Sequence, residues 1–78
     1  MATPANPRNV TFGLAEDGEH VEVWHDCDAH FDRAYAMLPL GGNGWTVEQR
    51  DPLTVRPSIL CRGCQLHGWI SNGAWFSA

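Results

Sequence analysis

Three cysteines restrict what this chain of 78 residues can fold into. Cys61 and Cys64 form a C-x2-C pair with Gly63 between them, a glycine that makes a tight turn easy. Cys27 lies far upstream, separated from the pair by 33 residues. Chains this short bury a small share of their surface and often add a disulfide, a metal or a partner subunit. Because a single disulfide would leave an odd thiol, we predict that the cysteines bind a metal ion.

The donor set indicates zinc. A C-x2-C turn lets both thiolates point at one ion while backbone N–H groups turn toward the sulfurs, and three thiolates with one imidazole complete the tetrahedral shell of a structural zinc site. His25 precedes Cys27 by two residues, on a stretch that is already extended at Val23-Trp24. The predicted ligands are therefore His25, Cys27, Cys61 and Cys64.

Two other histidines are alternatives for the fourth ligand. His67 gives C-x2-C-x2-H within one segment, and His30 gives C-x2-H after Cys27. We place His67 second and His30 third. The long separation between the two halves of the site suits a ribbon in which two hairpin-borne knuckles converge on one ion.

From residue 10 onward the chain reads as short strands separated by turns. Val21 and Val23 alternate with Glu22, which is the period-two pattern of a half-buried strand. Asn72-Gly73 is the strongest turn signal, because a type I′ hairpin needs positive φ at both central residues. The predicted strands are Val10–Leu14, His20–Trp24, Ala34–Leu38, Trp45–Gln49, Leu53–Leu60, His67–Ile70 and Ala74–Phe76.

One segment has two interpretations. Residues 28–38 could instead form a short helix, because Phe31, Ala34, Tyr35 and Leu38 fall at helical spacing. Residues 1–9 contain two prolines and two asparagines and are predicted to be a flexible N-terminal arm, and residues 10–78 a single domain. We predict a small all-β fold, with or without this one helix, in which zinc-ribbon-like antiparallel hairpins are stapled by one metal.

The charge distribution argues against binding to nucleic acid. Residues 1–32 carry seven acidic side chains and a single arginine. The net charge of the whole chain is −4. Nucleic-acid binding needs clustered cations, so it requires Arg33, Arg50, Arg56 and Arg62 to share one face. No apolar stretch reaches the roughly 20 residues of a membrane span, and no signal-peptide core is present. We predict a cytoplasmic setting in which the thiols stay reduced.

No catalytic motif stands out. The chain lacks H-E-x-x-H, lacks H-x-E paired with P-C-x-x-C, and has no phosphate-cradling glycine loop. Cys27 could act as a nucleophile with His25 or His30, but no third group orients the pair. We therefore predict that the protein is not an enzyme.

The segment PLTVRPSILCRGCQLHGWISNGAW, residues 52–75, resembles short uncharacterised zinc-ribbon-like proteins of actinobacteriophages, a phage and bacterial family of unknown function. The matching positions are His25, Cys27, Pro57-Ser58-Ile59, Cys61, Cys64, His67, Trp69-Ile70 and Gly73. The resemblance implies a small metal-stapled β-protein of a phage or prophage, working in the host cytoplasm or in the virion. It implies no activity.

These observations favour a non-enzymatic zinc module that binds a protein partner, either a host factor or a phage assembly. The acidic first half suits such a partner, and any of Trp45, Trp75 and Phe76 left exposed together would mark the contact surface. The alternatives are a structural component of the virion, a metal-dependent nuclease or hydrolase, and a ribbon that binds nucleic acid.

Overall fold

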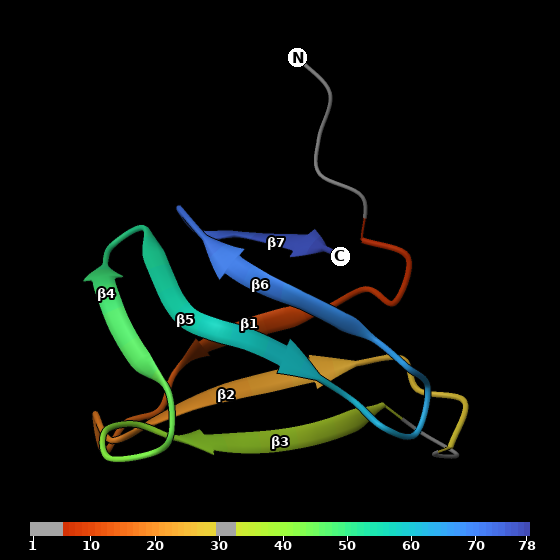
Figure 1. Cartoon of the computed structure of the whole chain (residues 1–78), viewed down its shortest axis with the longest axis horizontal. Coiled ribbons are helices and arrows are strands. Elements are labelled where there is room, and N and C mark those ends of the chain that lie inside the picture. Colours follow the sequence, from red (N-terminus) through yellow and green to blue (C-terminus); the bar gives the residue numbers. More distant parts are fainter. Residues whose placement is uncertain (1–5, 30–32) are drawn as a thin grey trace.

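The computed structural model describes residues 6–29 and 33–78, and within these ranges the chain forms seven strands and no helix. One antiparallel sheet has the order β1-β2-β3, and a second has the order β4-β5-β6-β7 (Figure 1). The strands are β1 (Thr11–Leu14), β2 (His20–His25), β3 (Ala34–Pro39), β4 (Thr46–Arg50), β5 (Leu53–Leu60), β6 (His67–Ser71) and β7 (Ala74–Ser77).

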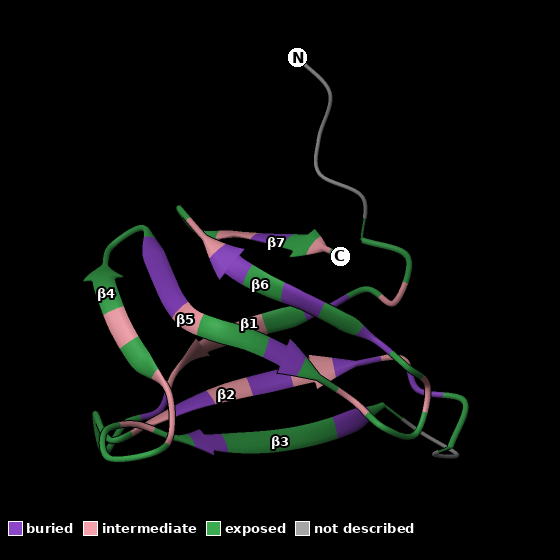
Figure 2. Ribbon diagram, in the orientation of Figure 1, coloured by how far each residue is buried: buried purple, intermediate pink, exposed green. Residues whose placement is uncertain are grey.

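The two sheets bury their facing sides against each other. Val21, Val23 and Leu38 from the first sheet share one core cluster with residues of the second sheet. The alternation of buried and more exposed residues is clearest along β2 and β6 (Figure 2). Successive side chains of a strand point to opposite faces, so this alternation fixes which face of each sheet turns inward. The second sheet contributes Leu53, Val55, Ile59, Ile70 and Trp75 to the core.

The predicted all-β fold is confirmed, and every predicted strand is present with boundaries shifted by at most one residue. The helical alternative is wrong over residues 34–38, which pair with β2 as strand β3. Ala34 and Leu38 are buried but Ala36, which shares their face, is exposed. The buried apolar residues of β3 are therefore four positions apart, which is also the spacing of one face of a helix. Phe31 lies outside the described residues.

Asn72 and Gly73 form the predicted turn between β6 and β7. Their φ angles are 49° and 76°, both in the left-handed region, and Ser71 pairs with Ala74 to close the hairpin. The turn donates the N–H of Gly73 to the carbonyl of Leu53 at 2.8 Å, which ties the hairpin to β5. The turn therefore sets the register of β7 and its position beside the rest of the sheet.

Replacing Gly73 with alanine should lower the free energy of unfolding by about 1–2 kcal/mol, because an L-residue at positive φ is strained. A Cβ at Gly73 would also lie 3.1 Å from the Cβ of Pro52. Gly13→Ala is a matched control, since no atom lies within 4 Å of its added Cβ and its φ is not in the left-handed region. Thermal unfolding of the two variants measures the difference, and equal melting temperatures would contradict the strain.

The tryptophans differ in how far they are buried. Trp75 is only 3% exposed and belongs to the core, so it is not one of the aromatic side chains that could mark a contact surface. Its Nε1 donates to the hydroxyl of Ser77 at 2.9 Å, which satisfies the buried indole. Trp69 and Phe76, cross-strand partners on β6 and β7, are 36% and 37% exposed. The outer face of this hairpin therefore presents two partly exposed aromatic side chains.

The segment before β1 is attached to the loop after β2. The guanidinium of Arg8 forms two hydrogen bonds to the carboxylate of Asp28, at 2.8 and 3.0 Å, and holds the pKa of that carboxyl below its ordinary value. The N–H of Asp26 donates to the carbonyl of Arg8 at 2.8 Å. The first five residues of the predicted arm lie outside the described ranges. Among the described residues there is no helix long and apolar enough to cross a membrane.

Candidate metal centre and serine–histidine pair

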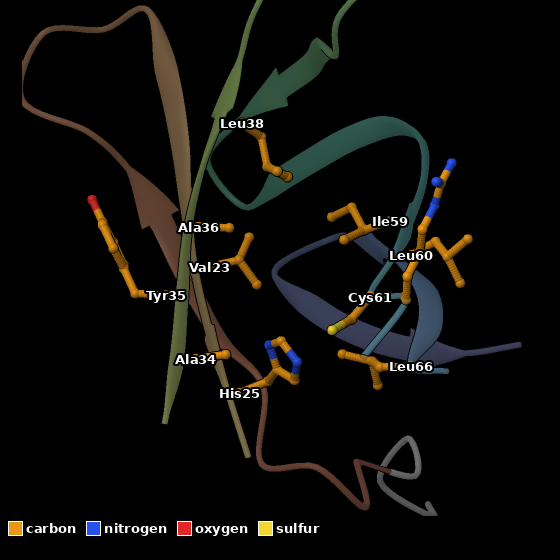
Figure 3. A pocket seen from close by; sticks show the side chains of 11 residues that line it. Val23, His25, Ala34, Tyr35, Ala36, Leu38, Ile59, Leu60, Cys61 and Leu66 are labelled. Atoms are coloured by element: carbon orange, nitrogen blue, oxygen red, sulfur yellow. The ribbon is translucent and has the colours of Figure 1, made fainter. Parts of the chain in front are cut away.

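Four side chains from both sheets converge at one end of the molecule. His25 is the last residue of β2 and Cys27 follows it, while Cys61 directly follows β5 and Cys64 lies in the next turn. One ligand atom from each of the four lies within 4.8 Å of the other three. The His25 ring and the Cys61 sulfur lie across a narrow space from each other (Figure 3). These are the four residues that the sequence spacing selects.

The distances fit a metal centre and not a disulfide. The Cys27 and Cys61 sulfurs are 3.7 Å apart, whereas a disulfide requires about 2.05 Å. Two thiolates bound to one tetrahedral zinc at about 2.3 Å are separated by about 3.8 Å. A Cβ at Gly63 would lie 3.3 Å from the Cys27 sulfur and 2.8 Å from the Cβ of Ala29. Gly63 therefore leaves room for the thiols to approach, and the donor set can hold a metal ion.

The turn after β5 prepares one of these thiols for coordination. Burial alone would raise the pKa of Cys61, but hydrogen bonds from the backbone N–H groups of Cys64 and Gly63 bring that pKa below its ordinary value. The Ala29 N–H acts in the same direction on Cys27, yet burial and the neighbouring thiols outweigh it, and the pKa of Cys27 is raised. Crowding of three thiols is favourable when a cation neutralises them.

The two alternative histidine ligands lie elsewhere. His67 is the first residue of β6, and its Nε2 lies 2.9 Å from the hydroxyl oxygen of Ser58. His67 is not a member of the cluster. His30 lies outside the described residues.

A bulge in β5 places Ser58 beside His67. Val55 pairs with Ile70 and Ile59 pairs with Gly68, so three β5 residues lie opposite one β6 residue between these two pairs. Such extra residues leave the ladder and re-aim their side chains. Ser58 is one of them and is exposed on the outer face, where its hydroxyl reaches the His67 ring. Its carbonyl accepts a hydrogen bond from Nε1 of Trp45 at 3.3 Å.

Two cysteines of the candidate metal centre lie in the loop that joins the strands of the serine–histidine pair. The chain from Cys61 to Leu66 connects the strand of Ser58 to the strand of His67, and the N–H of Cys61 donates to the carbonyl of Leu66 at 2.8 Å. Cys61 and Cys64 lie within this loop, three residues after Ser58 and three residues before His67. A metal ion at the cluster would therefore anchor the loop to the Cys27 segment of the first sheet.

The described residues contain Ser58 and His67 but no third side chain of the kind that orients the histidine in a catalytic triad. No ion pair joins a carboxylate of these residues to the His67 ring. A hydroxyl at hydrogen-bond distance from an imidazole is the minimal arrangement for a nucleophile and its base.

The fold and site define a small two-sheet β-protein with a His/Cys3 cluster and a surface serine–histidine pair. The family model described as "Bacterial ubiquitination-like system serine protease (BubE)" matches residues 2–78. The chain belongs to this family. No curated protein and no solved structure matches it.

This membership overturns the expectation that the protein is not an enzyme. The family is named for a serine protease, which places the chain in an enzyme-related family. The nucleophile that the sequence offers is Cys27 with His25 or His30, but Cys27 and His25 belong to the cluster that could hold a metal ion. No short sequence motif marks a serine–histidine pair that lies on two neighbouring strands.

The sequence analysis names both Ser58 and His67 but does not predict that they contact each other. Ser58 stood in the Pro-Ser-Ile segment and His67 was weighed as a metal ligand. A hairpin centred on the C-x2-C turn brings the residues on its two sides together, and this could have placed the serine near the histidine. The β5 bulge, which the sequence does not reveal, completes the approach.

Proposed function

We propose that the chain is a serine peptidase in which Ser58 is the nucleophile and His67 is its general base. The observation that carries the proposal is the distance of 2.9 Å between the Ser58 hydroxyl oxygen and Nε2 of His67, on an exposed face. Membership of a family named for a serine protease supports the same chemistry. Under this proposal the substrate is a protein of a bacterial ubiquitination-like system, as the family description indicates.

The reaction assigns one role to each side chain. Ser58 attacks the carbonyl carbon of the scissile bond while its proton passes to Nε2 of His67, which requires that Nδ1 carry the ring proton at that stage. His67 then donates the proton to the leaving group, and an acyl-enzyme ester forms on Ser58. Water, deprotonated by the same ring, attacks the ester carbonyl. The bond between the acyl carbon and the Ser58 oxygen breaks, the ring returns the proton to that oxygen, and the second product leaves as an acid.

The cluster of His25, Cys27, Cys61 and Cys64 is proposed to hold one structural zinc ion. Four protein donors fill a tetrahedral shell, so a zinc bound by all of them would stabilise the fold without an open position for water. The zinc would fix the loop between Ser58 and His67. A phage origin, a host-cytoplasm setting and a protein partner remain predictions beside this proposal.

A fluorophosphonate probe should label the native protein at Ser58 alone. The Ser58 oxygen would attack phosphorus and form a P–O bond as the P–F bond breaks, with fluoride leaving and the hydroxyl proton passing to His67. Mass spectrometry of tryptic peptides locates the adduct, and Ser71 and Ser77 of the same hairpin serve as internal controls. Labelling that is absent, or that is equal at all three serines, would contradict a selectively activated Ser58.

A further inference from the structure

A cavity of about 290 Å3 opens between the two sheets beside the proposed active site. The side chains of Val23, Ala36 and Leu38 enter it from the first sheet, and Ile59 faces them from β5 (Figure 3). Tyr35 points to the opposite side of β3 (Figure 3). Leu60 and Arg62 line the mouth of the cavity. The cavity is therefore mostly apolar, with His25 and Cys61 of the candidate metal centre at one end and Arg62 at its edge.

The C-terminal part of β5 has an open edge along this cavity. β4 pairs with β5 only from Leu53 to Arg56, and the remaining β5 residues have β6 on one side alone. Trp45 contributes one side-chain hydrogen bond there, to the carbonyl of Ser58. An open edge offers backbone groups to any extended chain that lies beside it.

The orientation of the Leu60 backbone follows from its neighbours. The N–H of Cys61 donates to the carbonyl of Leu66, so Cys61 and Leu66 form a hydrogen-bonded pair of the antiparallel ladder. Hydrogen-bonded and non-hydrogen-bonded pairs alternate, so the next pair, Leu60 with His67, is not hydrogen-bonded. The His67 carbonyl accordingly accepts from Ala78 on its other side. The N–H and the carbonyl of Leu60 therefore point away from β6, toward the open edge.

We infer that an extended peptide substrate binds along this edge as an added strand, with an apolar side chain in the cavity. This inference rests on the proposed function. Leu60 would donate one hydrogen bond to the substrate backbone and accept another, which is the recognition mode of strand addition. Leu60 lies two residues from Ser58, about 7 Å along a strand, so the scissile bond lies within two residues of the apolar side chain.

Two further observations favour a peptide of this kind. The side chain of Leu60 is 55% exposed at the cavity mouth, where a substrate strand would cover it. Arg62 is exposed, and none of the described carboxylates forms an ion pair with it. An acidic residue next to the apolar one would complement this cation. The occupant is thus an extended segment that carries an aliphatic residue followed or preceded by an acid.

The test uses internally quenched nonapeptides whose central pair is Leu-Glu, Leu-Lys or Asp-Glu. We expect cleavage of the Leu-Glu peptide to be fastest.

Ala36→Trp, which fills the cavity, should raise KM for that peptide at least tenfold. It should leave the rate of fluorophosphonate labelling of Ser58 unchanged, because the small probe does not need the cavity. Met37→Trp is the matched control on the outer face of the same strand and should leave both unchanged. Should Ala36→Trp not fold, Ala36→Ile makes a smaller obstruction at the same position.

A binding measurement separates this inference from the proposed function. In Ser58→Ala, hydrogen exchange of the Leu60 amide should slow at least tenfold when the Leu-Glu peptide is bound, and exchange of the Met37 amide should not change. An unchanged KM in the cavity-filled variant, equal cleavage of the three peptides, or a Leu60 amide that stays unprotected would overturn the inference while leaving the labelling of Ser58 untouched. Loss of labelling would instead remove the proposed function.

Discussion

Ser58→Ala should lower kcat/KM for peptide cleavage by at least about 10³-fold, because the variant has no hydroxyl to form the acyl-enzyme. Stability should change little. The Ser58 side chain is exposed, and its one described hydrogen bond is the one to His67. Steady-state cleavage of a quenched peptide, with circular dichroism to verify the fold, measures both quantities. Ser71→Ala, on the neighbouring strand, is the control and should retain full activity.

His67→Ala should cause a loss of similar size, and the double variant should be no worse than either single variant. A nucleophile and its base act as one unit, so their effects on the transition state do not add. Additive losses would indicate that the two residues act separately and that their 2.9 Å contact is only structural. Unchanged cleavage in Ser58→Ala would remove this serine from the mechanism altogether.

Removal of the metal should unfold or severely destabilise the chain. We expect one zinc per chain by elemental analysis, and a chelator should abolish the cooperative thermal transition. Binding of a structural zinc contributes about 10–16 kcal/mol in small zinc-dependent peptides, which exceeds the usual stability of a small domain. Cys61→Ser removes one thiolate and leaves the others crowded without a complete shell, so it should act in the same direction.

The same treatment should reduce fluorophosphonate labelling of Ser58, because the loop from Cys61 to Leu66 links the strands of Ser58 and His67. His20→Ala is a suitable control for histidine content, since His20 contacts Asp17 in the first hairpin, outside the cluster. Its zinc content should equal that of the unmodified chain. A purified protein without zinc, whose melting temperature is the same before and after chelation, would falsify the structural metal site.

The local sequence was sufficient for the strands and the turns. Alternation such as Val21-Glu22-Val23 fixes which face is buried, and Asn72-Gly73 tolerates the positive φ angles that close a hairpin. The four candidate ligands could also be selected from the sequence, because a C-x2-C turn directs both thiols toward the same ion. Cys27 is the third cysteine, and together with His25 it supplies the two further donors that a tetrahedral site needs.

The serine–histidine pair depended on tertiary structure. Ser58 lies in the stretch of β5 where the register with β6 shifts, two residues from Leu60, the partner of His67, and its hydroxyl reaches the His67 ring. Ala36 is exposed because the cavity opens next to it, which no local pattern indicates. Alternation, turn residues and the C-x2-C and H-x-C spacings are local features, so the sequence sufficed to predict the strands and to select the four candidate ligands. The serine–histidine contact and the cavity arise where the two sheets and an unpaired strand edge meet, so they depend on the folded chain.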